Sequence, residues 1–366
     1  MAELNNLTNP ITAMNQIHQI HLPPTFTVNQ AVDFKRNFQE ICQNNPDLTR
    51  AILDFSQTIF MDSSGLGALV SAKKLAQKQR IELVLRNVSE QVMMVLALAD
   101  LNKLFVIEEA PSEAEPLPTV HHEIAAEASP SLAESVPVVE AAAPFPKAPA
   151  VVKRRLKRED PFITHPSVRS PSKRAMDIAG ALVGLTITGL LAVPIAIAIT
   201  LDDPGPILFS QVRCSRMGRR FKMWKFRSMV INAEAKKHLV QNEASGAIFK
   251  ASHDPRITRV GRILRKTSLD ELPQFWNVLK GDMSLVGTRP PTPDEVERYE
   301  IPQWQRLDVK PGMTGEWQVN GRSAIKEFED IVRLDLQYQE NWSLMYDIKL
   351  ILKTVWILFN KSSGAM

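Results

Sequence analysis

The segment from Ile178 to Leu201 constrains this chain most, because its 24 residues include no charged side chain. As a helix it would be about 36 Å long, enough to cross a hydrocarbon core of about 30 Å. The residues alone leave three arrangements open: a buried core helix, a single straight span, or a hairpin that enters and leaves on one side. Pro194 removes a backbone donor inside the segment, so we expect the membrane helix to break or kink there.

Basic residues flank the apolar segment on both sides, and positive charge at both ends argues against a crossing. We therefore favour the hairpin, resting on an anionic membrane surface. A solvated coil or a nucleic-acid tail is the alternative for the first run, but a net charge of +4 does not by itself imply nucleic acid, and we expect none. The first run is Lys153, Arg154, Arg155, Lys157, Arg158, Arg169, Lys173 and Arg174, and the second is Arg213, Arg216, Arg219, Arg220, Lys222, Lys225 and Arg227.

The first hundred residues predict a small α/β domain. Apolar runs at 51–55 and 81–85 have the length of strands, and they alternate with helical patterns over 28–42, 63–79 and 89–100. The thiols of Cys42 and Cys214 lie far apart in the sequence, which predicts that both stay reduced.

A change in composition then divides the chain. Residues 111–150 hold eight prolines, six glutamates and one lysine, which predicts a flexible linker rich in Pro, Ala and Glu. We expect a first domain over 1–110, a disordered linker over 111–168 that ends in the basic run, and a second domain over 169–366 with the membrane hairpin at about 178–201.

Two features of the second half indicate a site that handles phosphates. Arg256, Arg259, Arg262 and Arg265 recur at three-residue spacing, which predicts one cationic face of a helix. Such a face is either merely solvated or a receptor for phosphates. The adjacent pair Asp270 and Glu271 follows, and neighbouring carboxylates near arginines can hold Mg²⁺ or attack phosphorus.

The acidic pair also has a purely structural interpretation. Ser268 and Glu271 have the spacing of a capping box that would open a helix ending at Gly281, although Pro273 fits this start poorly. That helix would bury Leu272, Phe275, Trp276 and Leu279.

Residues 256–290 read RITRVGRILRKTSLDELPQFWNVLKGDMSLVGTRP, and this stretch resembles the central signature of the bacterial sugar transferases. These are the monotopic polyprenyl-phosphate glycosyl-1-phosphate transferases. The resemblance covers roughly residues 170–366. It also includes KRAMD at 173–177, PGP at 204–206, FSQVR at 209–213, KFRSM at 225–229, VKPGMTG at 309–315 and YDIK at 346–349.

The resemblance implies transfer of a sugar-1-phosphate from a nucleoside diphosphate sugar, usually UDP-linked, to a polyprenyl phosphate such as undecaprenyl phosphate. It implies Mg²⁺ held at Asp270 and Glu271. By position, Asp270 would be the nucleophile that forms a phosphosugar intermediate, and Glu271 would assist at the metal or with a proton. Arg265 and Arg289 would bind phosphate groups, and Arg289-Pro290 would lie near the nucleotide. The apolar segment would be a re-entrant membrane helix broken at Pro194.

This half also contains two departures from the family pattern and an apolar stretch near residue 350. Thr288 stands where the family usually has a proline, and Ser215 stands where it usually has a glycine. Residues 344–359 are apolar with two interleaved lysines, which predicts either an amphipathic helix at the membrane interface or a terminal helix that packs on the core.

The stretch from Phe60 to Leu69, FMDSSGLGAL, is similar to the signature of STAS domains, the fold of anti-sigma factor antagonists. This resemblance covers about residues 15–110. It implies a regulatory module in which a protein kinase phosphorylates Ser63, with Ser64 as the adjacent candidate. A phosphate at the start of a helix meets free amides and the helix dipole. The alternative is that Asp62 or Ser63 only caps the helix.

Together these features predict a phosphoglycosyl transferase with an α/β fold, bound to the cytosolic face of a bacterial cytoplasmic membrane. It would initiate the assembly of an exopolysaccharide, capsule or O-antigen, and it would carry a STAS-like regulatory module. Its partners would be a UDP-sugar, polyprenyl phosphate, the membrane and a kinase or other regulator, while self-association is left open. The alternatives are a membrane-tethered STAS signalling adaptor with an inactive transferase half, and a scaffold in a polysaccharide assembly complex.

Overall fold

The chain is described here by a computed structural model that covers residues 16–108 and 164–360, except 237, 239, 244, 249, 250, 252, 253, 321–324 and 326. Residues 111–163 of the predicted linker, with the basic residues from Lys153 to Arg158, lie outside the described residues. The last residues of this linker do not fit the predicted disorder, because a short helix begins at Pro166. All residues predicted for the catalytic site and for regulation lie inside the described part of the chain.

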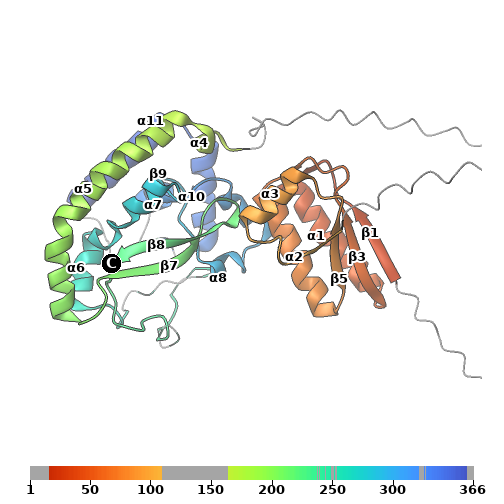
Figure 1. The fold of residues 1–366 in the computed structure, drawn as a ribbon, viewed down its shortest axis with the longest axis horizontal. Coiled ribbons are helices and arrows are strands. Elements are labelled where there is room, and N and C mark those ends of the chain that lie inside the picture. The colour runs from red at the N-terminus through yellow and green to blue at the C-terminus, as the bar shows by residue number, and fades with distance from the viewer. Residues whose placement is uncertain are drawn as a thin grey trace, which may run out of the picture. The chain divides into compact units, whose positions relative to one another are not determined.

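The N-terminal region is a parallel sheet covered by helices (Figure 1). Its four-stranded sheet has the order β1-β3-β5-β6, and a two-stranded parallel ladder pairs β2 with β4. Because every pairing in the larger sheet is parallel, helices must connect the strands. The elements are β1 (Gln16–His21), β2 (Thr25–Phe26), α1 (Val28–Asn44), β3 (Leu48–Asp54), β4 (Phe60–Met61), α2 (Ser63–Gln79), β5 (Glu82–Arg86), α3 (Glu90–Leu98) and β6 (Val106–Glu108).

The predicted elements of this region are confirmed. Helix α2 has the predicted bounds, and the other two helices and both strands agree with prediction to within two or three residues at each end. Helix α1 buries Phe34 and Phe38 against the sheet, and strands β3 and β5 bury Ala51 to Asp54 and Leu83 to Leu85. Both cysteines are free and buried, as expected.

The C-terminal region begins with a long apolar helix and continues through an antiparallel ribbon, a set of short helices and a small parallel ladder, β9–β10 (Figure 1). Its elements are α4 (Pro166–Arg169), α5 (Pro171–Asp202), β7 (Leu208–Cys214), η1 (Arg216–Gly218), β8 (Arg220–Phe226), α6 (Arg259–Lys266), η3 (Leu269–Glu271), α7 (Gln274–Lys280), β9 (Ser284–Val286), α8 (Pro293–Val296), η4 (Ile301–Leu307), β10 (Gly312–Thr314), α9 (Glu316–Asn320), α10 (Phe328–Glu340) and α11 (Leu344–Phe359).

Helix α5 contains the apolar segment, and it is long and apolar enough to cross a membrane. The helix does not break at Pro194, as one form of the prediction expected, because it continues through this residue as one element. Figure 1 shows instead that α5 curves along its length. The core-helix alternative is also wrong, since Leu190 is 75% exposed and Leu201 is 81% exposed.

One face of α5 nevertheless packs on the rest of the C-terminal region. The packing is close at two glycines: a side chain at Gly184 would overlap the Phe275 ring of α7, and one at Gly180 would meet Leu285 of β9. Further along, Ile195 and Ile199 share a buried cluster with Phe226 of β8 and Leu264 of α6. Small residues and this narrow apolar stripe therefore hold the helix against the protein.

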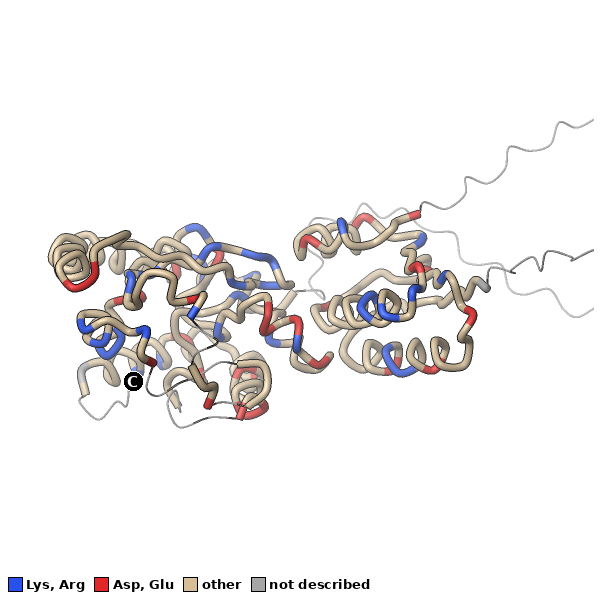
Figure 2. The backbone as a smooth tube through the Cα atoms, turned by 90° about the horizontal axis from the view of Figure 1, so that it is seen from below, with Lys and Arg blue, Asp and Glu red and all other residues tan. Residues whose placement is uncertain are grey.

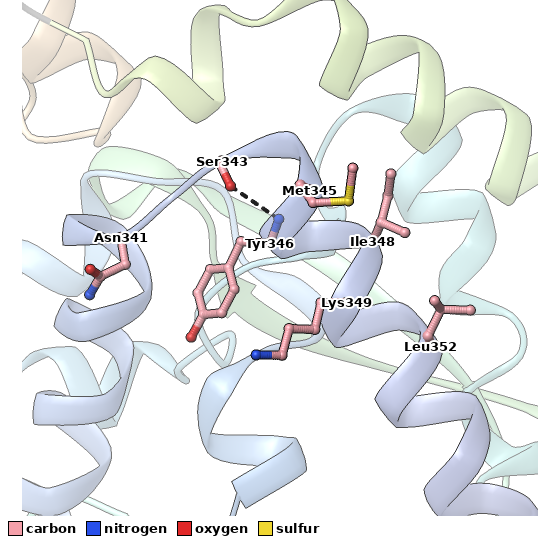
Figure 3. Close-up of a pocket in the computed structure, with 7 residues that line it drawn as sticks. All are labelled: Asn341, Ser343, Met345, Tyr346, Ile348, Lys349 and Leu352. Carbon is pink, nitrogen blue, oxygen red and sulfur yellow. Dashed lines mark hydrogen bonds between the residues drawn. The ribbon is translucent and has the colours of Figure 1, made fainter.

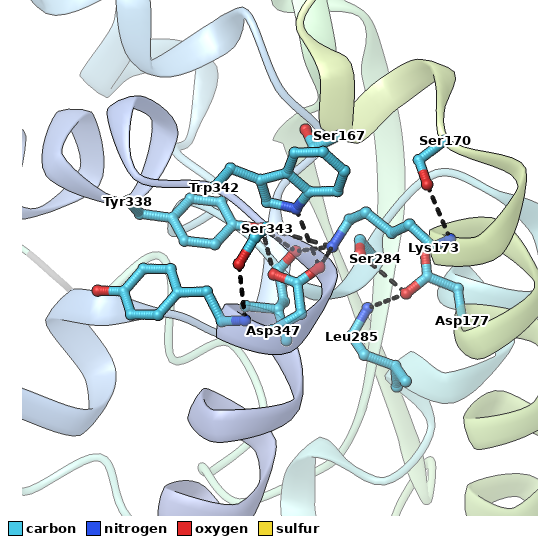
Figure 4. Close-up of polar contacts among 12 residues, drawn as sticks. Ser167, Ser170, Lys173, Asp177, Ser284, Leu285, Tyr338, Trp342, Ser343 and Asp347 are labelled. Carbon is cyan, nitrogen blue, oxygen red and sulfur yellow. Dashed lines mark hydrogen bonds and ion pairs between the residues drawn. The ribbon is translucent and has the colours of Figure 1, made fainter.

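Both ends of α5 are bound to the same folded region. At the start, Lys173 Nζ lies 2.5 Å from Asp347 Oδ2 in α11, and Asp177 accepts hydrogen bonds from Ser284 and from the amide of Leu285 (Figure 4). At the end, Asp202 accepts a hydrogen bond from the amide of Val260 in α6. Asp203, which follows the helix, pairs with Arg227, the residue after β8.

These contacts correct, for four residues of the two basic runs, the prediction that the basic flanks face a membrane. Lys173 is 4% exposed and points into the protein, and Arg174 donates to the last carbonyls of α7, those of Val278 and Leu279. Arg227 is also buried, and Lys225 pairs with Glu271. The sequence pattern could not show this, because the partners of these cations lie far away in the chain. Figure 2 shows basic and acidic positions interspersed along the backbone.

Helix α11 has the predicted bounds and is amphipathic. Met345, Leu352 and Trp356 are each more than 60% exposed, whereas Leu350 and Asp347 are buried. One side of the helix thus packs on the core, as predicted for a terminal core helix. The other side exposes a row of large apolar side chains, as predicted for an amphipathic helix at a membrane interface.

Candidate functional site

Asp270 and Glu271 lie in the short turn η3, between α6 and α7. Asp270 is 5% exposed, and Glu271 is half-buried with its Oε1 atom 2.9 Å from Lys225 Nζ of β8. The carbonyl oxygen of Leu272, just after the turn, accepts a hydrogen bond from Thr188 of α5. Strand β8 and helix α5 therefore both hold the turn that presents the acidic pair.

The capping-box interpretation of this turn is wrong. Ser268 has a left-handed backbone with φ of 56°, and its side chain makes no capping hydrogen bond. Helix α7 ends at Gly281 as predicted, but it buries Gln274, Asn277 and Val278 while Trp276 is 49% exposed. The reason is that the Asn277 side chain binds the backbone of β8, which turns the polar side of α7 inward.

The predicted arginine face is only partly present. Arg256 precedes α6 and is buried in a two-pronged ion pair with Asp254, so it belongs to a loop rather than to the helix. Arg265 lies in the last turn of α6, directly before the acidic turn. Its Nη1 atom is buried and has no hydrogen-bond partner among the described residues. A phosphate oxygen is the kind of acceptor that such a group lacks.

Arg289 is held by a partner that the sequence did not reveal. Its two terminal nitrogens lie 2.8 and 3.2 Å from the carboxylate of Glu295 in α8, and its guanidinium lies over the Trp317 ring. Burial tends to raise the pKa of Glu295, but the facing Arg289 outweighs this effect and brings that pKa to about 2. Arg289 is thus fixed in place by a carboxylate that stays ionised.

Arg213 of β7 is a further basic residue of this site. Its Nη1 atom donates to the carbonyl oxygen of Pro290, and its Nε atom is buried without a partner among the described residues. Burial and the charge of Arg289 lower the pKa of Arg213 to about 10, while Glu295 and Glu271 act in the opposite sense. Arg213 is therefore within electrostatic range of both the acidic pair and the Arg289 loop. Its only signal in the sequence was the FSQVR motif.

The two departures from the family pattern are accommodated locally. The Thr288 hydroxyl donates to the carbonyl oxygen of Arg306, 3.1 Å away, a bond that a proline could not make. Ser215 has φ of −95°, so its backbone does not need glycine, and its hydroxyl donates to the carbonyl oxygen of Asp282.

The residues present fit Mg²⁺ only as a site that substrate completes. Within the described part of the chain there is no group of three or more His, Cys, Asp or Glu side chains arranged to hold a metal. Mg²⁺ in nucleotide-dependent enzymes is commonly bound by one or two carboxylates, with water and substrate phosphates as its other ligands. Asp270 and Glu271 are a pair of this kind.

The sequence profile described as bacterial sugar transferase matches residues 168–361, which is more than half of the chain. This chain belongs to the bacterial sugar transferase family. The STAS domain profile matches residues 12–114 of the same sugar transferase.

Curated relatives match the same C-terminal half. The galactosyl transferase CpsE of Streptococcus agalactiae is 54% identical over 186 residues, which are 50% of this sugar transferase and 41% of that protein. The undecaprenyl-phosphate galactose phosphotransferase of Salmonella typhimurium is 44% identical over 198 residues, 52% of this chain and 41% of its own length. The UDP-glucose:undecaprenyl-phosphate glucose-1-phosphate transferase of Escherichia coli is 42% identical over 190 residues, 50% of this chain and 39% of its own length. The chain thus spans about two fifths of the length of these relatives.

The STAS signature is enclosed in protein. Asp62 caps α2 by accepting a hydrogen bond from the amide of Gly65, which confirms the capping role for Asp62. Ser63 and Ser64 are both fully buried. The Ser63 hydroxyl contacts Trp304 and Asp308, and the Ser64 hydroxyl has no hydrogen-bond partner among the described residues.

A shallow pocket of about 510 Å³ lies at the start of α11, and it contains none of the predicted catalytic residues (Figure 3). Apolar and polar side chains line it together. They are Asn341, Ser343, Met345, Tyr346, Ile348, Lys349 and Leu352.

Proposed function

We propose that this sugar transferase moves a sugar-1-phosphate from a UDP-hexose to undecaprenyl phosphate, the first membrane step in the assembly of a polysaccharide. The observation that carries the proposal is the buried Asp270, presented beside Glu271 and following Arg265, whose buried guanidinium nitrogen lacks a partner. The printed names of the relatives from Salmonella and Escherichia coli describe transfers of this type for those two proteins.

The proposed chemistry has two displacements at phosphorus. A carboxylate oxygen of Asp270 attacks the phosphorus that bears the sugar, and the bond from that phosphorus to the UMP oxygen breaks, so UMP leaves with the electron pair. An oxygen of undecaprenyl phosphate then attacks the same phosphorus and releases the Asp270 carboxylate. Arg265, Arg213 and Arg289 offer positive charge to the phosphate groups, and Glu271 assists at the metal or with a proton.

Magnesium is proposed at the same turn. Asp270 and Glu271 would hold it, together with oxygens of the diphosphate. When bound, the ion would offset the negative charge of the diphosphate, which otherwise repels an attacking carboxylate. Lys225, 2.9 Å from Glu271, keeps that carboxylate oriented toward the ribbon.

We propose that α5 is re-entrant and that the protein sits on the cytosolic face of the cytoplasmic membrane. A spanning helix would place its two ends on opposite sides of the bilayer, yet both ends of α5 contact the same folded region. The exposed apolar side chains of α5 and α11 supply the surface that lipid would cover. A site beside such a surface can receive a soluble nucleotide sugar and a lipid phosphate.

The STAS-like region is proposed to regulate the transferase. Ser63 is the proposed site of phosphorylation, and Ser64 is the adjacent candidate. Phosphate adds about two negative charges, which would repel neighbouring carboxylates.

The activity is tested by the release of UMP from the purified protein supplied with UDP-sugars, Mg²⁺ and undecaprenyl phosphate. Asp270→Asn should lose at least about a thousandfold in turnover, because it removes the nucleophile. Asp330→Asn, a partly exposed carboxylate of α10, is the matched control and should keep the wild-type rate. Mass spectrometry of the trapped enzyme should show a phosphosugar on Asp270. Unchanged turnover in Asp270→Asn would contradict the proposed nucleophile. Wild-type protein that binds these substrates but never produces UMP would favour the signalling adaptor.

The topology is tested by labelling of cysteines introduced at the exposed positions Ser172 and Pro206, which flank α5. Both should react with a membrane-impermeant reagent in inside-out vesicles and neither in sealed spheroplasts. Labelling on opposite sides would indicate a spanning helix.

A further inference from the structure

The STAS-like region and the transferase region share buried contacts that neither sequence signature predicts. We use "the Trp304 segment" for residues 299–308, which contain η4. Trp304, Ile301 and Leu307 are buried in the same apolar cluster as Leu66 and Leu69 of α2. An aromatic side chain enclosed in this way is typical of the centre of a protein interface.

Gly67 shows how closely the two surfaces fit. A Cβ atom at this position would lie only 2.6 Å from the Trp304 indole, and its three nearest neighbours all belong to that ring. The tightest obstacle to a larger residue at this position is therefore Trp304 of the transferase region. Residue 67 is therefore part of a surface shaped for a partner.

Ser63 lies at the polar centre of the same contact. Its hydroxyl oxygen is 2.6 Å from both the Trp304 carbonyl oxygen and Asp308 Oδ1, and its amide donates to the same carboxylate. Burial, above all, raises the pKa of Asp308, and burial together with Asp308 raises the pKa of Asp62 to about 7. Docking thus brings two carboxyl groups together around one serine, with no room for a third anionic group.

Two polar contacts flank this centre. Lys35 Nζ of α1 lies 2.8 Å from Glu300 Oε2, and Lys74 Nζ of α2 donates to the Glu297 carbonyl oxygen. Lys35 and Glu300 keep partial exposure, as expected for the rim of an interface.

From these contacts we infer that the STAS-like domain takes the transferase domain of its own chain as its binding partner, with the first two turns of α2 seated on the Trp304 segment. In the docked state Ser63 is out of reach of any modifying enzyme. A phosphate on Ser63 would meet the carboxyl groups of Asp62 and Asp308, so modification and docking exclude each other. The inference relies on the proposed transferase activity only for its kinetic consequence.

That consequence follows from what lies behind the Trp304 segment. The carbonyl oxygen of Arg306 accepts the hydrogen bond from Thr288, the residue before Arg289. The Arg306 guanidinium is buried against Asp335, with its Nη2 atom 2.6 Å from Oδ2. The docked segment therefore supports the loop that carries Arg289. Undocking should loosen this loop and raise the KM for the nucleotide sugar more than it lowers kcat.

The docking is tested by hydrogen exchange on the full chain in detergent micelles. Gly67→Leu should drive the introduced side chain into Trp304 and raise exchange in residues 301–308 by about tenfold or more, while the amides of β3 stay protected. Gln77→Leu places the same side chain at an exposed position of α2 and should change hydrogen exchange neither in residues 301–308 nor in β3. The double variant Gly67→Leu with Trp304→Ala removes the obstructing ring and should recover much of the protection.

A second measurement starts from the wild-type protein. A zero-length carbodiimide cross-link should join Lys35 to Glu300 there, independently of protein concentration. The same cross-link should disappear in Gly67→Leu. Unchanged exchange in 301–308 for Gly67→Leu with β3 protected, or a wild-type protein that forms no such cross-link, would overturn the inference. Neither readout depends on turnover, so a failure of the proposed activity would be seen separately.

Discussion

Helix α2 and helix α5 both contain a stretch rich in small and apolar residues, but the stretch is buried in α2 and largely exposed in α5. In α2 every residue from Ser63 to Leu69 is buried. In α5 the apolar side chains are mostly exposed, including Leu190 at 75% and Leu201 at 81%. Apolar surface left in water is costly, at roughly 25 cal/mol per Å². The difference shows that protein covers the start of α2, whereas most of the apolar surface of α5 is not covered by the described part of the protein.

Polar anchors show the same contrast. The start of α5 is held by a buried network in which Asp347 contacts Lys173, the Tyr338 hydroxyl and the Trp342 ring nitrogen (Figure 4). The start of α2 is held by its own cap, Asp62, and by its apolar neighbours. A helix whose apolar surface faces outward gains less from packing, so its position depends more on a few polar contacts.

The largest expected effect is on the anchor of α5. Lys173→Met leaves Asp347 buried without its cation, and this should lower the free energy of unfolding by about 3–5 kcal/mol. Denaturant unfolding of the detergent-solubilised protein measures the change. Arg36→Ala removes an exposed ion pair with Asp33 and should cost less than about 1 kcal/mol. Similar losses in the two variants would mean that the buried pair does not anchor the helix.

The apolar contrast itself can be broken by two matched truncations. Leu66→Ala in α2 should cost about 2–5 kcal/mol of stability, because it leaves a cavity in the core. Leu190→Ala in α5 should cost less than about 0.5 kcal/mol in the same detergent, because that side chain has few protein neighbours. Unfolding curves of both variants supply the comparison, and equal costs would show that Leu190 is covered by protein.

A charge placed on the exposed side of α5 should act on the membrane rather than on the fold. Leu190→Arg should weaken partition into vesicles by up to about 2.5–3.5 kcal/mol, which is the cost of placing a charged side chain in a bilayer. The loss is smaller if the arginine side chain reaches the lipid headgroups. Flotation with liposomes measures the bound fraction. Ile59→Arg, at a position 66% exposed in the STAS-like region, is the control and should leave partition unchanged.

The smallest expected effect is the pH dependence of the contact at α2. The docked state raises the pKa of Asp62 to about 7, so it binds protons more tightly than the undocked state does. Docking should therefore be strongest below the ordinary carboxyl range and should weaken as pH rises through about 7.

The charge of Asp308 acts directly on the Asp62 carboxyl and raises its pKa, and the charge of Arg216 acts on Asp308 and lowers the pKa of Asp308. Hydrogen exchange of residues 301–308 at pH 6 and pH 8, corrected for intrinsic exchange rates, measures the effect. Asp62→Asn should flatten the dependence, and a docked state that tightens with pH would contradict this assignment.

Patterns within short windows predicted much of the fold. The helix from Ser63 to Gln79, the terminal helix from Leu344 to Phe359 and the apolar segment of α5 all appear where periodicity and composition placed them. Predictions that depended on a distant partner were less accurate: Lys173 and Arg174 point inward, and Trp276 is exposed because its neighbour Asn277 binds strand β8. Nothing near these residues in sequence identifies Asp347, the end of α7 or strand β8 as the partner.

For the candidate site, the sequence by itself determined the acidic pair, the order of the arginines around it and the apolar segment, since each is a local pattern of residue types. Only the tertiary structure decided that Glu295 holds Arg289, that Arg213 contacts Pro290 in the same loop, and that Trp304 requires a glycine at position 67. The physical reason is that charge pairing and close packing depend on distance in space. Residues 213 and 289, or 67 and 304, become neighbours only when the chain has folded.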